Sequence, residues 1–397
     1  MGSSNKFGTM LLLFDLVGLL AVILLFILYW RKTKKLKKML KNMNAGERKA
    51  EEELAVGDDV ETSGLDDEKG KLVLLEEETR FELSHLLKAS AEGLGKGVFG
   101  NSYKAKIQGM PAVVVKRLKD LKALSSEEFM KQLSRIADQK HPNLLPLVAY
   151  YYSNHEKLMV HRFAPKGNLF NLIHGERGKA NRIPFRWNAR LSVARGVARA
   201  LEYLHLNNSQ SIVPHGNLKS SNVLLDENET PLVSDYGLIS LIALPIASTR
   251  MASFKSPEYQ TLKRVTKKSD VWSYGCLLLE LLTGRVSAHS APPGTNGVDL
   301  CSWVHRAVRE EWTAEIFDLE ISVQRNAASG MLRLLQIAIQ CCNKAPEKRP
   351  EMKQVVREVD NIEEVESDEE NLSSSLDHSL TDESHSTSAS AIIGDQT

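Results

Sequence analysis

The sequence HGNLKSSN, at residues 215–222, is followed at a short distance by DYG, at residues 235–237. Within the first segment Asn217 carries a side-chain amide, which accepts a hydrogen bond from a hydroxyl group but cannot take up its proton at neutral pH. Upstream, GKGVFG at residues 95–100 has the pattern Gly-x-Gly-x-x-Gly, which lets backbone amides approach phosphate groups without interfering side chains. A tight hairpin would also explain these glycines, so their meaning depends on the residues that follow.

Two strands and a helix are predicted between the glycines and HGNLKSSN. The residues YKA, at 103–105, are expected in the returning strand of a hairpin, and AVVVKRL, at 112–118, in a third strand that carries Lys116. Apolar residues recur at three- and four-residue spacing between residues 187 and 205. They predict an amphipathic helix that leads into HGNLKSSN, with its apolar face at Leu191, Ala194, Ala198 and Leu201.

The order and spacing of these motifs resemble those of protein kinases, in which a Gly-rich loop, a strand lysine, the catalytic loop HRDxKxxxN and the DFG motif follow one another. The sequences of residues 81–97, 113–120, 141–152 and 215–226 are similar to those of plant leucine-rich-repeat receptor-like kinases of the "probable inactive receptor kinase" group. This resemblance implies an α+β, two-lobed protein kinase fold over residues 81–362, with ATP and Mg²⁺ as cofactors.

The resemblance also assigns roles to single residues. Nucleotide phosphates are expected at the Gly-rich loop and the strand lysine, which are Gly95, Gly97, Gly100 and Lys116. Magnesium is expected at Asn222 and Asp235, and Lys219 matches the lysine of the catalytic loop. Glu258 and Arg349 match a buried ion pair of the large lobe, and Asp270 matches the aspartate that supports the catalytic loop.

Three departures from the family pattern remove catalytic function. Asn217 stands where kinases have the aspartate that accepts the substrate's proton, so the general base is missing. Gly216 replaces the neighbouring arginine, which grips a phosphorylated activation loop. Gln132, nine residues before His141, replaces the glutamate that pairs with the strand lysine, and Glu128 would substitute for it only if the helix moved by one turn.

Three further residues bear on the adenine pocket. Val114 adds bulk where kinases have alanine, and Ser102 removes apolar surface where they have valine. Together these changes are expected to weaken nucleotide binding by ~1 to 3 kcal/mol. His161 occupies the gatekeeper position, and we expect it to be a hydrogen-bonded residue of the back wall without a role in pH sensing.

Residues 10–30 contain one charge, Asp15, and would span ~31 Å as a helix, so they predict a single transmembrane helix. The basic cluster at residues 31–41 predicts a plasma-membrane protein with residues 1–9 outside the cell and the kinase-like domain in the cytoplasm. A cleaved signal peptide is the alternative. A juxtamembrane linker is predicted over residues 31–80, because the basic cluster is followed by an acidic stretch without aromatic residues at 42–78. An acidic, serine-rich and disordered tail is predicted over residues 363–397 and is a candidate for phosphorylation.

The relatives that the sequence resembles have leucine-rich ectodomains, whereas no repeat of 20 to 29 residues occurs here. Either the protein is a short membrane-anchored paralogue or its gene model is truncated. The four cysteines form no CxxC pair and are expected to be reduced, mostly buried cytosolic thiols without a zinc site. The basic residues near the predicted span lack interleaved aromatic residues, which argues against nucleic-acid binding.

Three functions remain open. The first is a membrane-anchored pseudokinase that binds ATP and docks other receptor kinases or signalling proteins. The second is a serine/threonine kinase that works, or works weakly, with the retained Lys116, Lys219, Asn222 and Asp235. The third is an interaction scaffold that binds no nucleotide.

Overall fold

The computed structural model describes residues 70–75, 81–97, 99–206, 214–288, 297–310 and 313–365. The predicted transmembrane helix at residues 10–30 lies outside these ranges, as does the predicted tail at residues 363–397 except for its first three residues. Within them, no helix is both long and apolar enough to cross a bilayer.

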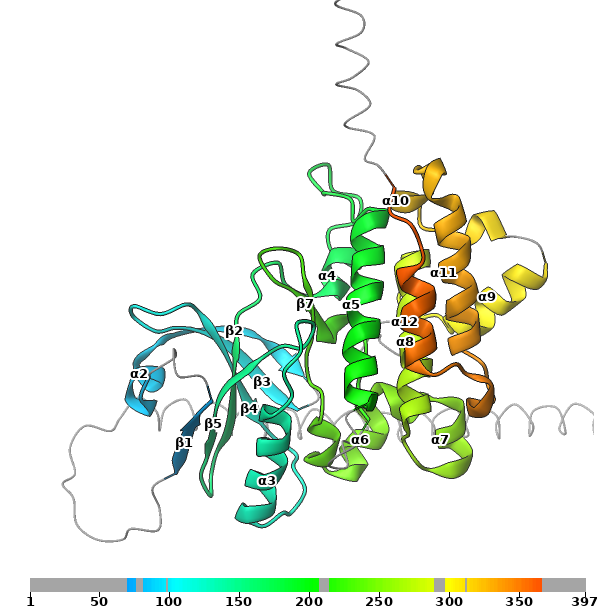
Figure 1. The fold of residues 1–397 in the computed structure, drawn as a ribbon. Coiled ribbons are helices and arrows are strands. Elements are labelled where there is room, and N and C mark those ends of the chain that lie inside the picture. The colour runs from blue at the N-terminus through cyan, green and yellow to red at the C-terminus, as the bar shows by residue number, and fades with distance from the viewer. Residues whose placement is uncertain are drawn as a thin grey trace, which may run out of the picture. The chain divides into compact units, whose positions relative to one another are not determined.

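The small lobe is built on one antiparallel sheet (Figure 1). Its six strands pair in the order β1-β5-β6-β4-β3-β2. The strands are β1 (Lys71–Leu74), β2 (Ser90–Gly97), β3 (Gly100–Lys106), β4 (Val113–Leu118), β5 (Leu147–Tyr152) and β6 (Lys157–Arg162). Two helices belong to this lobe, α2 (Leu83–Lys88) and α3 (Ser126–Ala137). β1 pairs with β5 although it lies before residue 81, in the segment that its acidic flanks had placed in the linker.

The predicted third strand is β4, and its alternation decides where Lys116 points. Val113 and Val115 are buried in a cluster with strand residues of β5 and β6. Successive side chains of a strand face opposite sides of the sheet, so Lys116 lies on the other face. Lys116 therefore faces the site described below, where it meets Asp235.

The large lobe is mainly helical (Figure 1). Its helices are α4 (Leu169–His174), α5 (Trp187–Leu206), α6 (Leu244–Arg250), α7 (Pro257–Leu262), α8 (Lys267–Thr283), α9 (Leu300–Arg309), α10 (Leu319–Ser322), α11 (Ala328–Cys341) and α12 (Met352–Asp360). A two-stranded ladder, β7 (Val223–Leu225) with β8 (Pro231–Val233), lies between HGNLKSSN and DYG.

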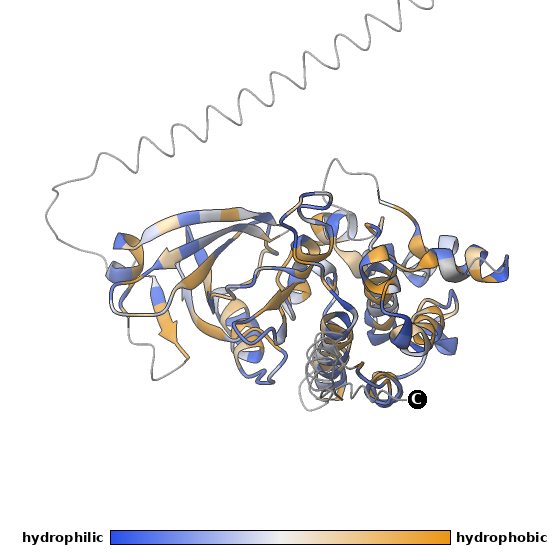
Figure 2. Ribbon diagram, turned by 90° about the horizontal axis from the view of Figure 1, so that it is seen from above, coloured by the Kyte–Doolittle hydropathy of each residue, from blue (hydrophilic) through white to orange (hydrophobic). Residues whose placement is uncertain are grey.

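α8 is the central helix, because every residue from Ser269 to Thr283 is buried. α5 buries the predicted apolar face, with Leu191, Ala194, Ala198 and Leu201 fully inaccessible. Hydrophobic residues occur along the elements of both lobes, interleaved with polar ones (Figure 2). The two-lobed fold with mixed helix and sheet is the one that the sequence predicted.

Candidate functional site

Asn217 lies in the catalytic loop between α5 and β7 and is 1% exposed. Its side-chain oxygen accepts a hydrogen bond from the backbone amide of Ala252, at 3.2 Å. Its side-chain nitrogen is buried and has no hydrogen-bond partner among the described residues. The amide is thus covered by the segment that follows DYG, and its acceptor atom is used within the protein.

Asp270, near the start of α8, supports this loop from below. One carboxylate oxygen accepts from the backbone amide of His215 at 2.8 Å, and the other accepts from that of Gly216 at 2.9 Å. His205, at the end of α5, lies 3.1 Å from the first oxygen. Two charge-assisted bonds to adjacent amides fix the backbone of the loop, which is the role that the resemblance assigned to Asp270.

Gly216 has a structural requirement that the sequence did not reveal. Its φ is +75°, a backbone conformation that residues other than glycine rarely adopt. A Cβ atom at this position would also lie 2.6 Å from the terminal carbon of Ile239. The position that holds an arginine in the kinase pattern is therefore closed by Ile239 in this protein.

Lys116 and Asp235 form a direct ion pair between the small lobe and the DYG segment. Asp235 is held at φ 65°, a strained conformation of the kind that concentrates at functional sites. Burial alone would raise the pKa of Asp235, but the charge and hydrogen bond of Lys116 outweigh burial and lower it. The carboxylate is therefore ionised at neutral pH.

The side chains of Lys116, Asn222 and Asp235 offer atoms that suit a nucleotide and a metal ion. The side-chain nitrogen of Asn222 donates to the backbone carbonyl of Asn217 at 2.9 Å, so its side-chain oxygen is the atom left to face a cation. Oxygen ligands of this kind, with the carboxylate of Asp235, suit Mg²⁺. Lys116 is the cation that would meet phosphate oxygens.

Lys219 lies half-buried two residues after Asn217. Burial lowers the pKa of Lys219, and the ammonium groups of Lys255 and Lys116 lower it further, against the opposing effect of Asp235. The next residue, Ser220, donates to the buried carboxylate of Glu280 at 2.7 Å, which ties this end of the loop to α8.

α3 does not supply a partner for Lys116. The side-chain nitrogen of Gln132 donates to Glu128 on the preceding turn at 2.6 Å. The substitution of Glu128 for the missing glutamate, which the sequence left open, is thus not realised in this structure. Lys116 turns to Asp235 instead.

Two buried rings lie close to Lys116 and Asp235: His161 on β6, and Tyr236 directly after Asp235. The ring of His161 is 6% exposed and lies 3.2 Å from the carbonyl oxygen of Pro146. Burial lowers the pKa of His161 to about 4, with a further contribution from Lys116. Tyr236 is also buried, and its hydroxyl donates to the carbonyl of Leu145 at 2.9 Å.

The segment after DYG is fastened to the small lobe just before α3. Leu121 and Ile242 form an antiparallel bridge, and Lys122 donates its backbone amide to the carbonyl of Leu241 at 2.8 Å. The ammonium group of Lys122 donates to the carbonyl of Ser240 at 2.9 Å. These backbone contacts carry no sequence signature, so the closed position of the segment could not be predicted.

The far end of this segment is anchored by Glu258 and Arg349. Both side chains are buried and meet through two hydrogen bonds, of 2.9 and 2.8 Å. The pairing is the one that the resemblance implied.

The Gly-rich pattern lies where β2 turns into β3, with Gly97 opposite Gly100. Gly100 is required here, because its φ is +131° and a Cβ atom would lie 1.8 Å from the carbonyl oxygen of Arg117. Gly95 sits at φ +147° beside an irregularity in the pairing. Val98, at the tip, is outside the described residues.

Sequence comparisons with known proteins also identify a protein kinase. A family described as protein tyrosine and serine/threonine kinase matches residues 89–359. The chain is 41% identical over 336 residues to the leucine-rich repeat receptor-like protein kinase PXC1 of Arabidopsis thaliana, covering 81% of this chain and 50% of that protein. It is 43% identical over 284 residues to a "probable inactive receptor kinase" of the same plant, covering 71% of this chain and 44% of that one.

Solved structures of receptor kinase domains are also similar to this chain. The kinase domain of maize sucrose-induced receptor kinase 1, bound to AMP-PNP, aligns with a TM-score of 0.64 at 32% identity over 74% of this chain and 99% of its own. The pseudokinase domain of BIR2, an immune regulator of the RLK/Pelle family, aligns with a TM-score of 0.62 at 26% identity over 78% of this chain and 95% of its own.

The chain spans about half the length of the curated relatives it matches. The kinase family matches residues 89–359, a range that contains Lys116, Asn217 and Asp235. The chain therefore belongs to the protein tyrosine and serine/threonine kinase family, and its folded core is a receptor-like kinase domain.

Proposed function

We propose that this protein is a membrane-anchored pseudokinase, which binds ATP with Mg²⁺, docks other receptor kinases or signalling proteins, and does not transfer phosphate. The observation that carries the proposal is the state of Asn217. The residue at the position of the general base is an amide, it is 1% exposed, and its oxygen is occupied by the backbone amide of Ala252.

Neither Asp270 nor Asp235 is free to take over the role of Asn217. Asp270 is fully buried beneath the loop, and its oxygens receive the amides of His215 and Gly216. Asp235 is paired with Lys116. Loss of general-base catalysis costs typically 10² to 10⁴ in rate. The absent ion pair between α3 and Lys116 adds to this loss, because that pair helps to set the active arrangement of kinases.

Nucleotide binding is supported by the donor atoms that remain. Lys116 would bind phosphate oxygens, and Asn222 and Asp235 would hold Mg²⁺. Lys219, with its lowered pKa, lies beside them as a further cation. Bound Mg·ATP would supply opposite charges for both members of the Lys116 and Asp235 pair, so the pair can open without leaving either charge unmatched.

Docking is the function that fits a well-built large lobe with an impaired catalytic loop. Glu258 with Arg349, and Asp270 with the loop backbone, preserve architecture and do not depend on phosphate transfer. The resemblance to receptor-like kinases points to other receptor kinases as partners, at the cytoplasmic face of the plasma membrane.

A thermal-shift titration tests the nucleotide part of the proposal. ATP with Mg²⁺ at 100 times its dissociation constant should add ~2.7 kcal/mol to the free energy of unfolding. Lys116→Met and Asp235→Asn should abolish that gain. If wild-type protein shows no shift at millimolar ATP, the domain is a scaffold that binds no nucleotide.

A further inference from the structure

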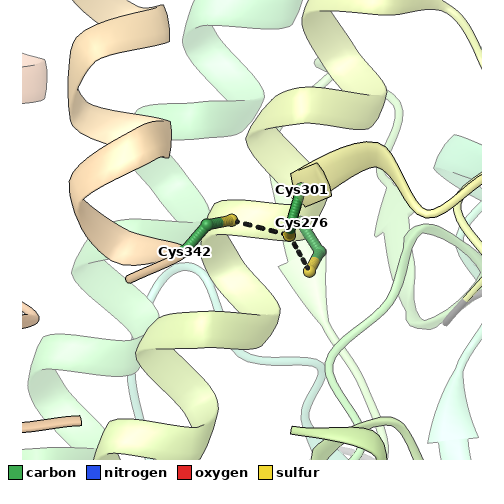
Figure 3. Close-up of side chains that lie close together, drawn as sticks. All are labelled: Cys276, Cys301 and Cys342. Carbon is green, nitrogen blue, oxygen red and sulfur yellow. Dashed lines mark hydrogen bonds between the residues drawn. The ribbon is translucent and has the colours of Figure 1, made fainter. Parts of the chain in front are cut away.

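Three cysteines from separate parts of the large lobe converge on one point (Figure 3). Cys276 lies in α8, Cys301 in the first turn of α9, and Cys342 directly after the last residue of α11. The sulfur atoms of Cys276 and Cys301 are 3.4 Å apart, and those of Cys301 and Cys342 are 3.1 Å apart. All three sulfurs lie within 4.8 Å of one another.

The packing of the helices produces this convergence. Gly275 precedes Cys276 and faces the end of α11, where an added Cβ atom would lie 2.7 Å from the sulfur of Cys342. Only glycine lets α8 and α11 approach so closely. The spacing of the cysteines along the sequence gave no sign of a site, because the three side chains meet through the tertiary fold.

The cluster is enclosed on one side and open on the other. Cys276 and Cys342 are 5% and 2% exposed, whereas Cys301 is partly exposed. Cys301 and Cys342 also line a surface groove. The groove carries several cationic side chains, Lys255, Arg306, Arg309 and Lys344. A small ion can therefore reach the sulfurs through this groove, which Asp299 and His305 also line.

We propose that Cys276, Cys301 and Cys342 form a binding site for a soft metal ion, Cu(I), held by three sulfur ligands. Thiolates select soft ions such as Cu(I) and Zn²⁺. Within the described residues the group contains no histidine or carboxylate, so it lacks the fourth protein ligand of a structural zinc site. A zinc ion held by three protein ligands needs a water in its fourth position, whereas Cu(I) needs no ligand beyond the three sulfurs, so we assign the site to Cu(I).

Binding involves no change of oxidation state. Each thiol that becomes a ligand releases its proton to solvent, and the sulfur lone pair forms the bond to Cu(I). Burial raises the pKa of Cys276 and Cys342, so both sulfurs are protonated thiols before the metal arrives. A bound ion would join α8, α9 and α11, far in sequence from Lys116 and Asp235.

A competition titration with Cu(I) tests the site. The full 397-residue chain, reduced and kept in detergent without oxygen, is mixed with Cu(I) held by a chromogenic chelator. Wild-type protein should withdraw one Cu(I) per chain. Cys276→Ser, Cys301→Ser and Cys342→Ser should each weaken binding about tenfold or more, which is the scale of losing a ligand or its support. The matched control is Cys341→Ser, since Cys341 is fully buried beside Cys342 but is not in the cluster; it should bind as wild type does.

A second measurement needs no substitution and therefore does not depend on how the variants fold. Cys301 is partly exposed and should react with iodoacetamide, as read by mass spectrometry. One equivalent of Cu(I) should slow that reaction about tenfold or more. The proposal fails if reduced wild-type protein withdraws no copper, if Cys341→Ser loses as much affinity as the cluster variants, or if Cu(I) leaves Cys301 fully reactive.

Discussion

The side-chain oxygen of Asn217 accepts a hydrogen bond from the backbone amide of Ala252, at 3.2 Å. This contact joins the catalytic loop to the segment after DYG and buries the residue that would have to face a substrate hydroxyl. Two defects therefore meet at Asn217: the residue is not a base, and the segment after DYG covers it. Restoring the carboxylate at position 217 repairs only one of the two defects.

Asn217→Asp alone should raise phosphate transfer by less than about tenfold, well below the typical 10² to 10⁴ contributed by a general base. Addition of Gln132→Glu should raise it further, because a carboxylate on α3 competes for Lys116 and releases Asp235 for metal binding. Incorporation of labelled phosphate into a peptide mixture measures both effects. Ser134→Glu, on an exposed face of the same helix, is the matched control and should add nothing to Asn217→Asp. A full thousandfold gain from Asn217→Asp alone would show that closure of the segment is unimportant.

His161 should make the stability of the domain depend on pH. Its pKa is about 4 in the folded protein, mainly because of burial, and ~6.5 when unfolded. The unfolded chain therefore binds more protons between these values, so the free energy of unfolding falls as the pH is lowered from ~6.5 toward 4. The loss from this group is about 3 kcal/mol at pH 4.

Urea denaturation between pH 4 and 7 measures this effect in wild type and in His161→Gln, which keeps a donor for the carbonyl of Pro146. The stability difference between the two proteins should shift by about 3 kcal/mol over that range. Parallel curves for the two proteins would mean that the ring is not held neutral by burial.

Gly216→Ala should destabilise the domain for two reasons, the positive φ and the contact with Ile239. Backbone strain of this kind costs ~1 to 3 kcal/mol, and the clash adds to it. Gly109→Ala is the matched control, because Gly109 has φ +77° but nothing within 4 Å of an added Cβ atom. Ile239→Val should recover part of the loss in Gly216→Ala and none in Gly109→Ala. Equal denaturation midpoints for the two glycine variants would rule out the clash.

Glu258→Gln should cost ~3 to 5 kcal/mol, because it leaves the buried charge of Arg349 without its partner. Replacing both residues by apolar ones of similar volume should cost much less. Lys179→Met provides the comparison at an exposed ion pair, with Glu176, where both side chains are 67% exposed and little stability should be lost. Chemical denaturation of the four proteins gives the values, and a small loss in Glu258→Gln would show that the pair is not buried in solution.

The sequence predicted the parts of the site that depend on residue type and spacing. The strand that carries Lys116, the amphipathic helix α5 and the pairing of Glu258 with Arg349 follow from periodicity or from motifs that a family shares. At Gly216 the sequence indicates only a lost cation, because the contact of this glycine with Ile239 depends on a segment that is distant in the sequence. The cover over Asn217 is a backbone amide, which any residue at position 252 other than proline could supply. The three cysteines meet only through helix packing.

The most direct test of the account is phosphate transfer by the wild-type protein. Purified protein is incubated with labelled ATP and Mg²⁺, and incorporation into itself and into a peptide mixture is compared with that of Lys116→Met and Asp235→Asn. We predict that all three proteins give the same background, because Asn217 cannot accept the substrate's proton. Incorporation by wild type that rises above background and disappears in both variants would contradict the account.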